Sequence, residues 1–286
     1  MKLKNNNRSE ATYALVTVTD SSFLVGTLIL FHSFLKHNPW FTGDLVVIES
    51  DLNEQEKKLL SVFPNLLFHT PNKQILERTE ILGHFWKTAH ENSKQFYSIE
   101  AFGLNKYKKV LLLDSDILCL ENINNLFFEF NDCAIFAVPD SLESKNELRD
   151  NSNFLPVSLD KLQTGNEYYK SFNSGVVLIN LPHLPSDAYQ SLIKLINPID
   201  FSSNHTRHTD QFVMNKLLKG HVNFLPFKYN FLLNANNLER KKKNIQIAFV
   251  HYVEENKPWN LKGSENKYIS LWYEYYANFK LERTVI

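Results

Sequence analysis

Short, continuous apolar runs alternate with amphipathic segments in the N-terminal part of the chain. The runs at 11–18, 44–48 and 66–69 have the length and composition of strands that are buried on both faces. Between the last two runs, Asn53 is placed to cap a short helix that ends near Pro64. A longer helix between the first two, capped by Ser21 or Ser22, repeats its apolar residues every three or four positions at Leu24, Leu28, Phe31 and Leu35. This βαβαβ alternation predicts the α/β fold class, with a parallel sheet flanked by helices.

The rest of the chain continues the alternation with two interruptions. Further strands are expected at 110–113, 117–120, 133–138, 175–181 and 245–252. Further helices are expected at 93–102, 184–195, 210–218 and 268–281, the last rich in aromatic residues. Residues 70–87 have weak periodicity and are expected to form a loop. Residues 141–170 are polar and irregular, which predicts an insertion or a mobile lid.

Composition narrows the class of protein. The 31 basic and 31 acidic residues cancel, which argues against a dedicated nucleic-acid-binding protein. The two cysteines, Cys119 and Cys133, lie in apolar runs and are expected to be free thiols in a reducing compartment. No apolar stretch approaches the length of a membrane span, and residues 1–10 read as a flexible polar tail rather than a signal peptide. A cytoplasmic protein is therefore expected, with residues 11–286 forming a single domain that ends in a helix.

The sequence Asp114-Ser115-Asp116 directly follows the apolar run 110–113. In extended backbone, alternate side chains point the same way, so the two carboxylates converge. Two adjacent carboxylates at the end of a buried strand repel each other unless a cation neutralises them, and ligands bind at this edge of open α/β sheets. The alternative is an ordinary turn, because Asp and Ser both favour turns. The tripeptide alone leaves both interpretations open.

Other polar motifs accompany the two acids along the chain. In order they are Thr17-Val18-Thr19-Asp20, Val138-Pro139-Asp140, Phe172-Asn173-Ser174-Gly175, Thr209-Asp210-Gln211, Leu225-Pro226-Phe227-Lys228-Tyr229-Asn230, and His251-Tyr252 with Lys257-Pro258-Trp259. Their order and spacing, from about 13 to 259, resemble the family 8 retaining glycosyltransferases, with glycogenin-like proteins as the nearest members. The resemblance implies a Rossmann-like, nucleotide-sugar-binding fold of GT-A type with a mixed, mostly parallel sheet flanked by helices. It also implies a UDP-sugar donor and a divalent metal, usually Mn²⁺ with Mg²⁺ as the alternative.

The resemblance also assigns roles by position. The metal ligands would be Asp114, Asp116 and His251, and Lys257 would reach the leaving phosphate. The other donor-binding positions would be Val18, Thr19 and Asp20 for the uracil and ribose, Phe23 for stacking on the base, and Lys94, Ser115, Asp140, Asn173 and Ser174. Asp140, Asn173, Asp210 and Gln211 would contact the transferred sugar. Asp210 and Gln211 would flank the anomeric carbon as the catalytic positions. Because an amide is a poor nucleophile, same-face attack is favoured, with the leaving phosphate taking the acceptor's proton. Without the resemblance, His251 also fits a histidine at the end of a strand whose ring is hydrogen-bonded within the protein. Lys94 also fits a solvent-exposed lysine on a helix.

Three departures from the family pattern affect the expected activity. Glu254 stands where the family commonly has Gly. Before Asp210, this chain has Arg207-His208-Thr209, where glycogenin-like proteins have acidic and glycine residues. The stretch 231–250 contains no Tyr, so self-glucosylation at the glycogenin position is not expected. Tyr168 and Tyr169 are the alternative self-acceptors.

The sequence thus predicts a metal-dependent retaining hexosyltransferase that moves a hexose, with glucose expected, from a UDP-sugar to a glycan or protein acceptor. The protein itself is one candidate acceptor, and a homodimer is an open alternative to a monomer. A non-catalytic nucleotide-sugar-binding or scaffold protein on the same fold is the second hypothesis. A nucleotidyltransferase is set aside, because such enzymes typically carry a glycine-rich phosphate loop after the first strand and Thr19-Asp20-Ser21-Ser22 is not one.

Overall fold

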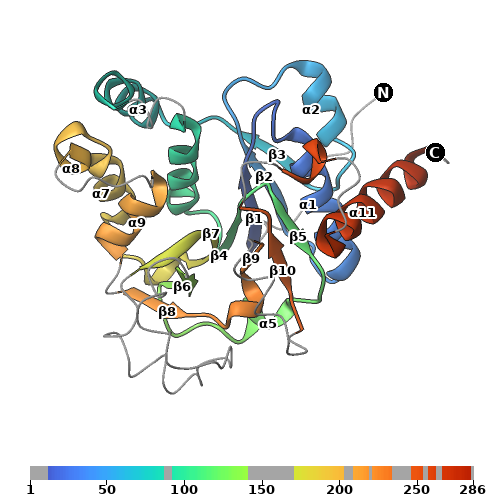
Figure 1. The fold of residues 1–286 in the computed structure, drawn as a ribbon. Helices are drawn as coiled ribbons and strands as arrows, with labels where there is room; N and C mark the ends of the chain where they lie inside the picture. The colour runs from blue at the N-terminus through green and yellow to red at the C-terminus, as the bar shows by residue number, and fades with distance from the viewer. Residues whose placement is uncertain are drawn as a thin grey trace, which may run out of the picture.

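A computed structural model of the chain describes residues 12–86, 92–140, 171–202, 209–218, 221–233, 246–253, 257–261 and 266–284. Within these residues the central sheet has seven strands in the order β3-β2-β1-β4-β7-β6-β8 (Figure 1). The strands are β1 (Tyr13–Val18), β2 (Asp44–Ile48), β3 (Leu66–His69), β4 (Lys109–Leu113), β6 (Ile135–Pro139), β7 (Phe172–Asn180) and β8 (Val222–Phe224).

The sheet is mixed and mostly parallel, as predicted. The pairs β2–β3, β1–β2, β1–β4 and β6–β8 are parallel. Only β7 runs the other way, antiparallel to both β4 and β6, among the strands that the structure describes. The parallel half supplies the carboxyl-end edge at which ligands bind in α/β sheets.

A second, smaller sheet brings distant parts of the chain to this edge. It contains β5 (Ile117–Cys119), β9 (Phe231–Leu232) and β10 (Phe249–His251). Strand β10 pairs antiparallel with β5, with His251 opposite Ile117, and parallel with β9. The register places the end of β10 beside the turn between β4 and β5.

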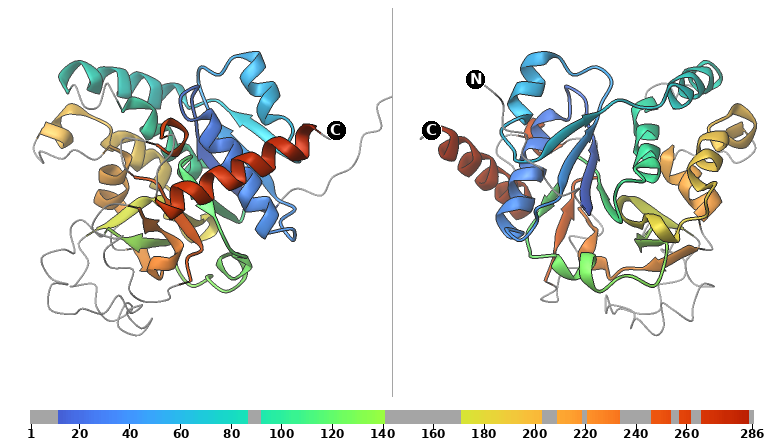
Figure 2. Two further views of the ribbon diagram at one scale, coloured as in Figure 1. Left: turned by 45° about the vertical axis from the view of Figure 1, so that its right-hand side comes forward. Right: turned by 180° about the vertical axis from the view of Figure 1, so that it is seen from behind.

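Helices cover both faces of the central sheet (Figure 2). One face carries α1 (Leu24–His37) and α11 (Lys267–Thr284), and α11 packs across α1. The other face carries η1 (Ser93–Gly103), α7 (Ala188–Leu195) and α9 (Asp210–Leu218). The other helices of the described residues are α2 (Glu54–Leu60), α3 (Lys73–Phe85), α5 (Asn124–Phe128), η4 (Leu181–His183), α8 (Pro198–Ser202), η6 (Phe227–Tyr229) and η7 (Pro258–Asn260).

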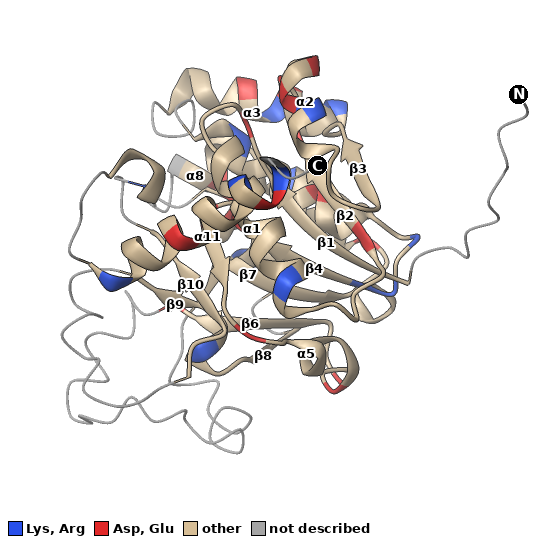
Figure 3. Ribbon diagram, turned by 90° about the vertical axis from the view of Figure 1, so that its right-hand side faces the viewer, with Lys and Arg blue, Asp and Glu red and all other residues tan. Residues whose placement is uncertain are grey.

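The two helical layers explain the continuous apolar runs of the strands. In β4, Leu111 and Leu113 pack into the core cluster under α1, whereas Val110 and Leu112 pack into the cluster under η1. A strand with apolar contacts on both faces needs no polar alternation. Acidic and basic residues are interspersed along α2 and α11 (Figure 3).

Most elements lie where the sequence predicts them, with several corrections. The loop prediction for 70–87 was wrong, because Lys73–Phe85 forms α3, which Asn72 begins by accepting a hydrogen bond from the Gln74 amide. The helix predicted at 93–102 is present at Ser93–Gly103, with 3₁₀ geometry. Strand β7 begins earlier than expected, at Phe172, and β10 is shorter than the predicted 245–252.

The remaining predictions stand as follows. The helix cap at Asn53 is confirmed, and Glu56 completes it as a capping box. The aromatic C-terminal helix is also confirmed. Cys119 and Cys133 are free thiols. Among the described helices, none is both long enough and apolar enough to cross a bilayer. The expected tail at 1–10 and the expected lid at 141–170 lie outside the described residues.

Candidate active site

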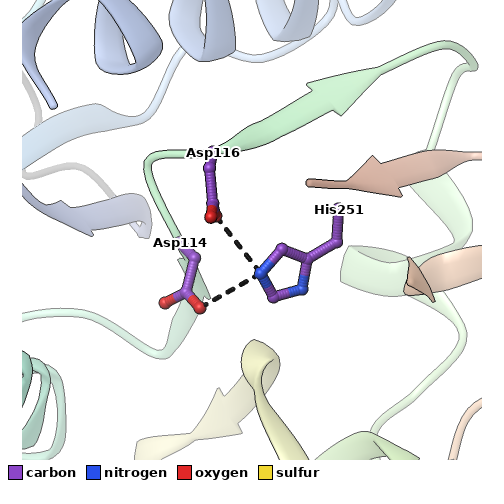
Figure 4. A group of neighbouring side chains, drawn as sticks. All are labelled: Asp114, Asp116 and His251. Atoms are coloured by element: carbon purple, nitrogen blue, oxygen red, sulfur yellow. Dashed lines mark ion pairs between the residues drawn. The ribbon is translucent and has the colours of Figure 1, made fainter. Parts of the chain in front are cut away.

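Asp114, Asp116 and His251 converge at the junction of the two sheets (Figure 4). His251 Nε2 lies 3.4 Å from Asp114 Oδ2 and 3.2 Å from Asp116 Oδ1. One ligand atom from each residue lies within 4.8 Å of the other two. The acids flank the turn from β4 to β5, and the β5–β10 register brings the histidine to them. The predicted convergence is therefore present.

The site is closed on one side and open on the other. Asp116 and His251 are buried, with 7% and 4% of their surfaces exposed, whereas the Asp114 side chain is 43% exposed. Partial desolvation and repulsion from Asp116 raise the pKa of Asp114 to about 7, against the attraction of His251. Desolvation also opposes ionisation of Asp116, but His251 and Lys257 outweigh it and hold the pKa of Asp116 below its usual range.

The arrangement of lone pairs fits a divalent cation. Burial lowers the pKa of His251, but attraction to Asp116 and Asp114 outweighs it and raises the pKa above its usual value. Asp116 Oδ1 is buried and receives no hydrogen bond from the part of the chain that the structure describes. The site thus favours a positive charge between Nε2 and the carboxylates, either a proton or a bound cation. Two carboxylates and one imidazole suit Mn²⁺, with Mg²⁺ as the harder alternative.

Gly175 on β7 lies directly against this cluster. A Cβ atom at this position would overlap His251 Cε1 and lie 2.7 Å from His251 Nδ1 and 2.9 Å from Asp114 Oδ2. The Gly175 carbonyl also accepts a 2.9 Å hydrogen bond from the Asp114 amide. A larger residue would displace the histidine or the acid, so the glycine is needed for close packing rather than for a turn.

Lys257 lies on the other side of Asp116. Its Nζ donates to Asp116 Oδ2 at 2.7 Å and to the Tyr252 carbonyl at 2.8 Å. The same Nζ lies 5.8 Å from the centroid of the Phe23 ring, which makes an edge contact with Trp259. Lys257 therefore lies next to the expected metal ligands, and Phe23, a predicted base-stacking residue, lies next to Lys257.

The end of β1 carries the predicted nucleoside positions. Thr19 donates its amide to the Ile48 carbonyl, and Asp20 accepts bonds from the backbone amides of Ser22 and Phe23 at the start of α1. Although burial opposes it, Ser22 and Lys94 lower the pKa of Asp20. Its carboxylate lies 3.1 Å from Lys94 Nζ, which also pairs with Asp51 at 2.6 Å. Lys94 is therefore an ion-paired lysine beside the predicted donor site.

Ser115 serves a different purpose from the two acids around it. Its hydroxyl is buried, donates to the Val18 carbonyl and lies 3.1 Å from Thr17 Oγ1. These contacts fasten the Asp-Ser-Asp turn to β1. Both Ser115 and Val18 thus lie at the predicted site, but the Ser115 hydroxyl and the Val18 carbonyl bond to each other.

The predicted sugar-binding residues form one connected group. Gln211 Nε2 donates to Asp140 Oδ2 at 2.7 Å, and Gln211 Oε1 accepts from Asn173 Nδ2 at 3.1 Å and from the Ser174 amide at 3.3 Å. Asp140, Ser174 and Gln211 are buried, and Asn173 is half-buried. The end of β6, the start of β7 and the start of α9 supply these side chains.

Asp210 is held beneath this group. Its Oδ2 accepts a 2.8 Å bond from Ser98 Oγ on η1, and its Oδ1 accepts from the Gln211 amide at 2.9 Å. Desolvation raises the pKa of Asp210 against these hydrogen bonds. The carboxylate is therefore oriented by the protein's own donors.

Sequence reasoning missed two residues of the site. Ser98 gave no signal, because its partner Asp210 is 112 residues away. Asn230 is the last residue of the motif at 225–230, but the sequence assigned no role to it. In the structure its Oδ1 lies 3.0 Å from His251 Nδ1, and its Nδ2 donates to Asn173 Oδ1 at 2.7 Å. Glu254, residues 207–208, Tyr168 and Tyr169 lie outside the described residues.

A mixed, mostly parallel sheet with paired acids at its edge defines a GT-A glycosyltransferase fold, and solved structures support this. The galactosyltransferase LgtC, in complex with donor and acceptor sugar analogs, superimposes with a TM-score of 0.69 and 18% identity, covering 93% of this chain and 95% of LgtC. Mouse xyloside xylosyltransferase 1 superimposes with a TM-score of 0.53 and 16% identity, covering 85% of this chain and 97% of that one.

The family follows from the sequence. Residues 14–263 match the profile of glycosyl transferase family 8, so the chain belongs to that family. It is 25% identical over 279 residues to a lipopolysaccharide 1,2-glucosyltransferase of Escherichia coli K12, covering 91% of this chain and 76% of the relative. It is 26% identical over 250 residues to the lipopolysaccharide glucosyltransferase WaaO of the same organism, covering 85% and 71%. The predicted family is confirmed.

Proposed function

We propose that this glycosyltransferase is a metal-dependent, retaining hexosyltransferase that moves glucose from UDP-glucose to a glycan acceptor. The observation that carries the proposal is the convergence of Asp114, Asp116 and His251 Nε2, with Lys257 Nζ 2.7 Å from Asp116. This is a cluster of oxygen and nitrogen lone pairs with an ammonium beside it. Such a cluster suits a diphosphate leaving group that arrives with a divalent cation.

The residues around the cluster have separate tasks. Asp114, Asp116 and His251 would hold the ion, and a bound ion would stabilise the negative charge that develops on the UDP phosphates. Lys257 places a positive charge on the same side, where it favours departure of the phosphate. The nucleoside would lie at the end of β1, beside Asp20.

The sugar would lie against the group formed by Asp140, Asn173 and Gln211. In support, a solved LgtC variant is an active-site mutant in which a glutamine is replaced by glutamate, and Gln211 is a buried glutamine in this site. Fixed amide and carboxylate groups orient sugar hydroxyls and so position the anomeric carbon.

Same-face attack is the route to retention that the hydrogen bonds favour. The Gln211 amide is engaged at both ends, and both Asp210 oxygens already accept hydrogen bonds. Because these hydrogen bonds occupy both groups, neither is well placed to attack the anomeric carbon as a nucleophile. The acceptor hydroxyl would approach from the side of the leaving phosphate and transfer its proton to a phosphate oxygen as the glycosidic bond to UDP breaks.

A glycan acceptor and a glucosyl donor are favoured by the relatives. Two of them are lipopolysaccharide glucosyltransferases, and LgtC was solved with donor and acceptor sugar analogs. Self-modification at Tyr168 or Tyr169, a cytoplasmic location and a homodimer stay predictions.

The test is a transfer assay with a defined donor panel. The purified chain is incubated with Mn²⁺, lipopolysaccharide-core oligosaccharides and either UDP-glucose or UDP-galactose, and the product is examined by NMR. Transfer of glucose with an α linkage supports the proposal, whereas a β-linked product contradicts retention. Sugar found on the chain by intact mass, with no transfer to added glycan, would contradict the glycan acceptor. Replacement of the exposed His183 by Ala is the control for His251→Ala, which is expected to abolish transfer.

A further inference from the structure

A chain of side-chain hydrogen bonds joins the metal-site histidine to the sugar-side carboxylate. It passes through amides from three separate parts of the chain. His251 Nδ1 lies 3.0 Å from Asn230 Oδ1, and Asn230 Nδ2 donates to Asn173 Oδ1 at 2.7 Å. From there, Asn173 Nδ2 donates to Gln211 Oε1 at 3.1 Å, and Gln211 Nε2 donates to Asp140 Oδ2 at 2.7 Å. The imidazole and the carboxylate are therefore ends of one network.

Backbone amides fix the direction of this network. The Gly175 amide donates to Asn173 Oδ1 at 3.0 Å, and the Ser174 amide donates to Gln211 Oε1 at 3.3 Å. A backbone N–H can only donate, so the side-chain atom facing it must be an oxygen. The orientation of both amides thus follows from the β7 backbone and does not depend on telling nitrogen from oxygen.

The hydrogen bonds also determine which ring nitrogen of His251 carries the proton. Because Asn173 presents its oxygen to Asn230, Asn230 must present its NH₂ in return, which turns Asn230 Oδ1 toward His251 Nδ1. That nitrogen must then carry the proton. In the neutral ring, His251 Nε2 is then left with its lone pair directed at Asp114 and Asp116.

Asn230 is well placed to enforce this arrangement. It is 1% exposed, so water cannot readily replace its partners. Its backbone is set by η6, where its amide donates to the Phe227 carbonyl at 3.1 Å. The neighbouring Tyr229 is fastened by a 2.5 Å bond from Asn125. The amide is therefore presented by a fixed turn.

We propose that Asn230 is a positioning residue that holds His251 in the Nδ1–H tautomer, with Nε2 kept as the metal-ligating atom. The role of the ion rests on the proposed function, whereas the tautomer does not. Residues that orient a ligating histidine typically change metal affinity by 10- to 100-fold when they are removed. The same side chain ties the histidine to Asn173, and hence to the sugar-side pair of Gln211 and Asp140.

Two substitutions separate these contacts. Asn230→Leu removes both, so Mn²⁺ affinity in the presence of UDP is expected to fall by about 10- to 100-fold. Asn230→Asp keeps an acceptor for the His251 proton but cannot donate to Asn173. Its Mn²⁺ affinity should therefore be retained, without the loss expected for Asn230→Leu, while kcat falls. Circular dichroism and thermal melting establish that each variant is folded.

The tautomer itself is measured by ¹⁵N NMR of the metal-free protein labelled at histidine, at alkaline pH where the ring is neutral. The His251 signal is identified by its loss in His251→Gln. Protonation at Nδ1 in the wild type and in Asn230→Asp, and its loss in Asn230→Leu, is the expected result. Protonation at Nε2 in the wild type, or unchanged Mn²⁺ affinity and tautomer in folded Asn230→Leu, would overturn the proposal. A wild-type protein that shows the Nδ1–H tautomer but neither binds Mn²⁺ nor transfers sugar would contradict the proposed function instead.

Discussion

Lys257 Nζ and Asp116 Oδ2 lie 2.7 Å apart, and this contact links Lys257, directly before η7, to the cluster of Asp114, Asp116 and His251. The ammonium also donates to the Tyr252 carbonyl, and its side chain is 14% exposed. A partly buried charge that is held at two points needs little reorganisation when negative charge develops beside it.

Lys257→Met is therefore expected to lower kcat by about 10²- to 10³-fold, with a smaller change in the KM for the donor. Steady-state kinetics with the UDP-sugar measure both constants. Lys58→Met, at an exposed lysine on α2, is the matched control and should leave both unchanged. Wild-type kcat in Lys257→Met would show that the ammonium does not assist the leaving group.

Gly175→Ala tests the close packing under the histidine. The added methyl would overlap the His251 ring and lie 2.9 Å from Asp114 Oδ2. Displacement of a ligating group by about 1 Å is expected to lower transfer by roughly 10²-fold. Gly103→Ala is the control, because its methyl would lie 2.9 Å from the Tyr189 ring, away from the site. The control should lose stability in a thermal melt and keep its rate; full activity in Gly175→Ala would refute the packing argument.

Gln211→Glu tests the 2.7 Å contact with Asp140. The introduced carboxylate would face the Asp140 carboxylate, so one of the two would have a raised pKa and the pair would share a proton. The ratio of variant to wild-type activity is expected to rise as the pH falls from about 8 to 6, because the shared proton restores the hydrogen bond. Gln211→Leu should show a loss that is independent of pH. A constant ratio for Gln211→Glu would argue against the contact.

Lys109 provides a test of stability away from the site. Its ammonium is buried and donates to the carbonyls of Phe127 and Phe130, and burial lowers its pKa to about 8 from 10.5. Between these pH values the unfolded chain binds more protons than the folded one, so this group makes the free energy of unfolding rise with pH.

Denaturation of the wild type and of Lys109→Met is compared across this range. The difference in unfolding free energy, wild type minus variant, should rise by roughly 1 kcal/mol per pH unit between about pH 8 and 10.5. A flat or falling difference would mean that Lys109 titrates normally in the folded protein.

Local sequence was sufficient to predict the central strands. The runs in β1, β2 and β4 are apolar because both faces are covered, and that pattern is visible without knowing the partners. Helix α3 was missed because its buried positions are only Ile75, Thr79 and Leu82, and one of these is polar. Apolar periodicity also could not separate the 3₁₀ geometry of η1 from an α-helix.

The site divides in the same way. Asp114 and Asp116 were predictable because two acids directly follow the buried apolar run of β4, although residues 115–116 form a turn rather than extended backbone. His251 and Gln211 were predictable because motifs marked them. The roles of Asn230 and Ser98 depend on contacts made across 21 and 112 residues. Apolar runs predicted β5 and β10 of the small sheet, but the two-residue β9 gave no pattern, and the pairing of β10 with β5 that brings His251 opposite Ile117 cannot be read from local sequence.

The central claim is that Asp114, Asp116 and His251 hold a divalent ion that the transfer requires. The most direct measurement is UDP release from UDP-glucose with a glycan acceptor, in Mn²⁺ and in excess chelator, for the wild type, Asp116→Ala and His251→Ala. Release is expected only from the wild type with Mn²⁺, with all three proteins folded by circular dichroism. Full release in excess chelator, or from either variant, would contradict the claim.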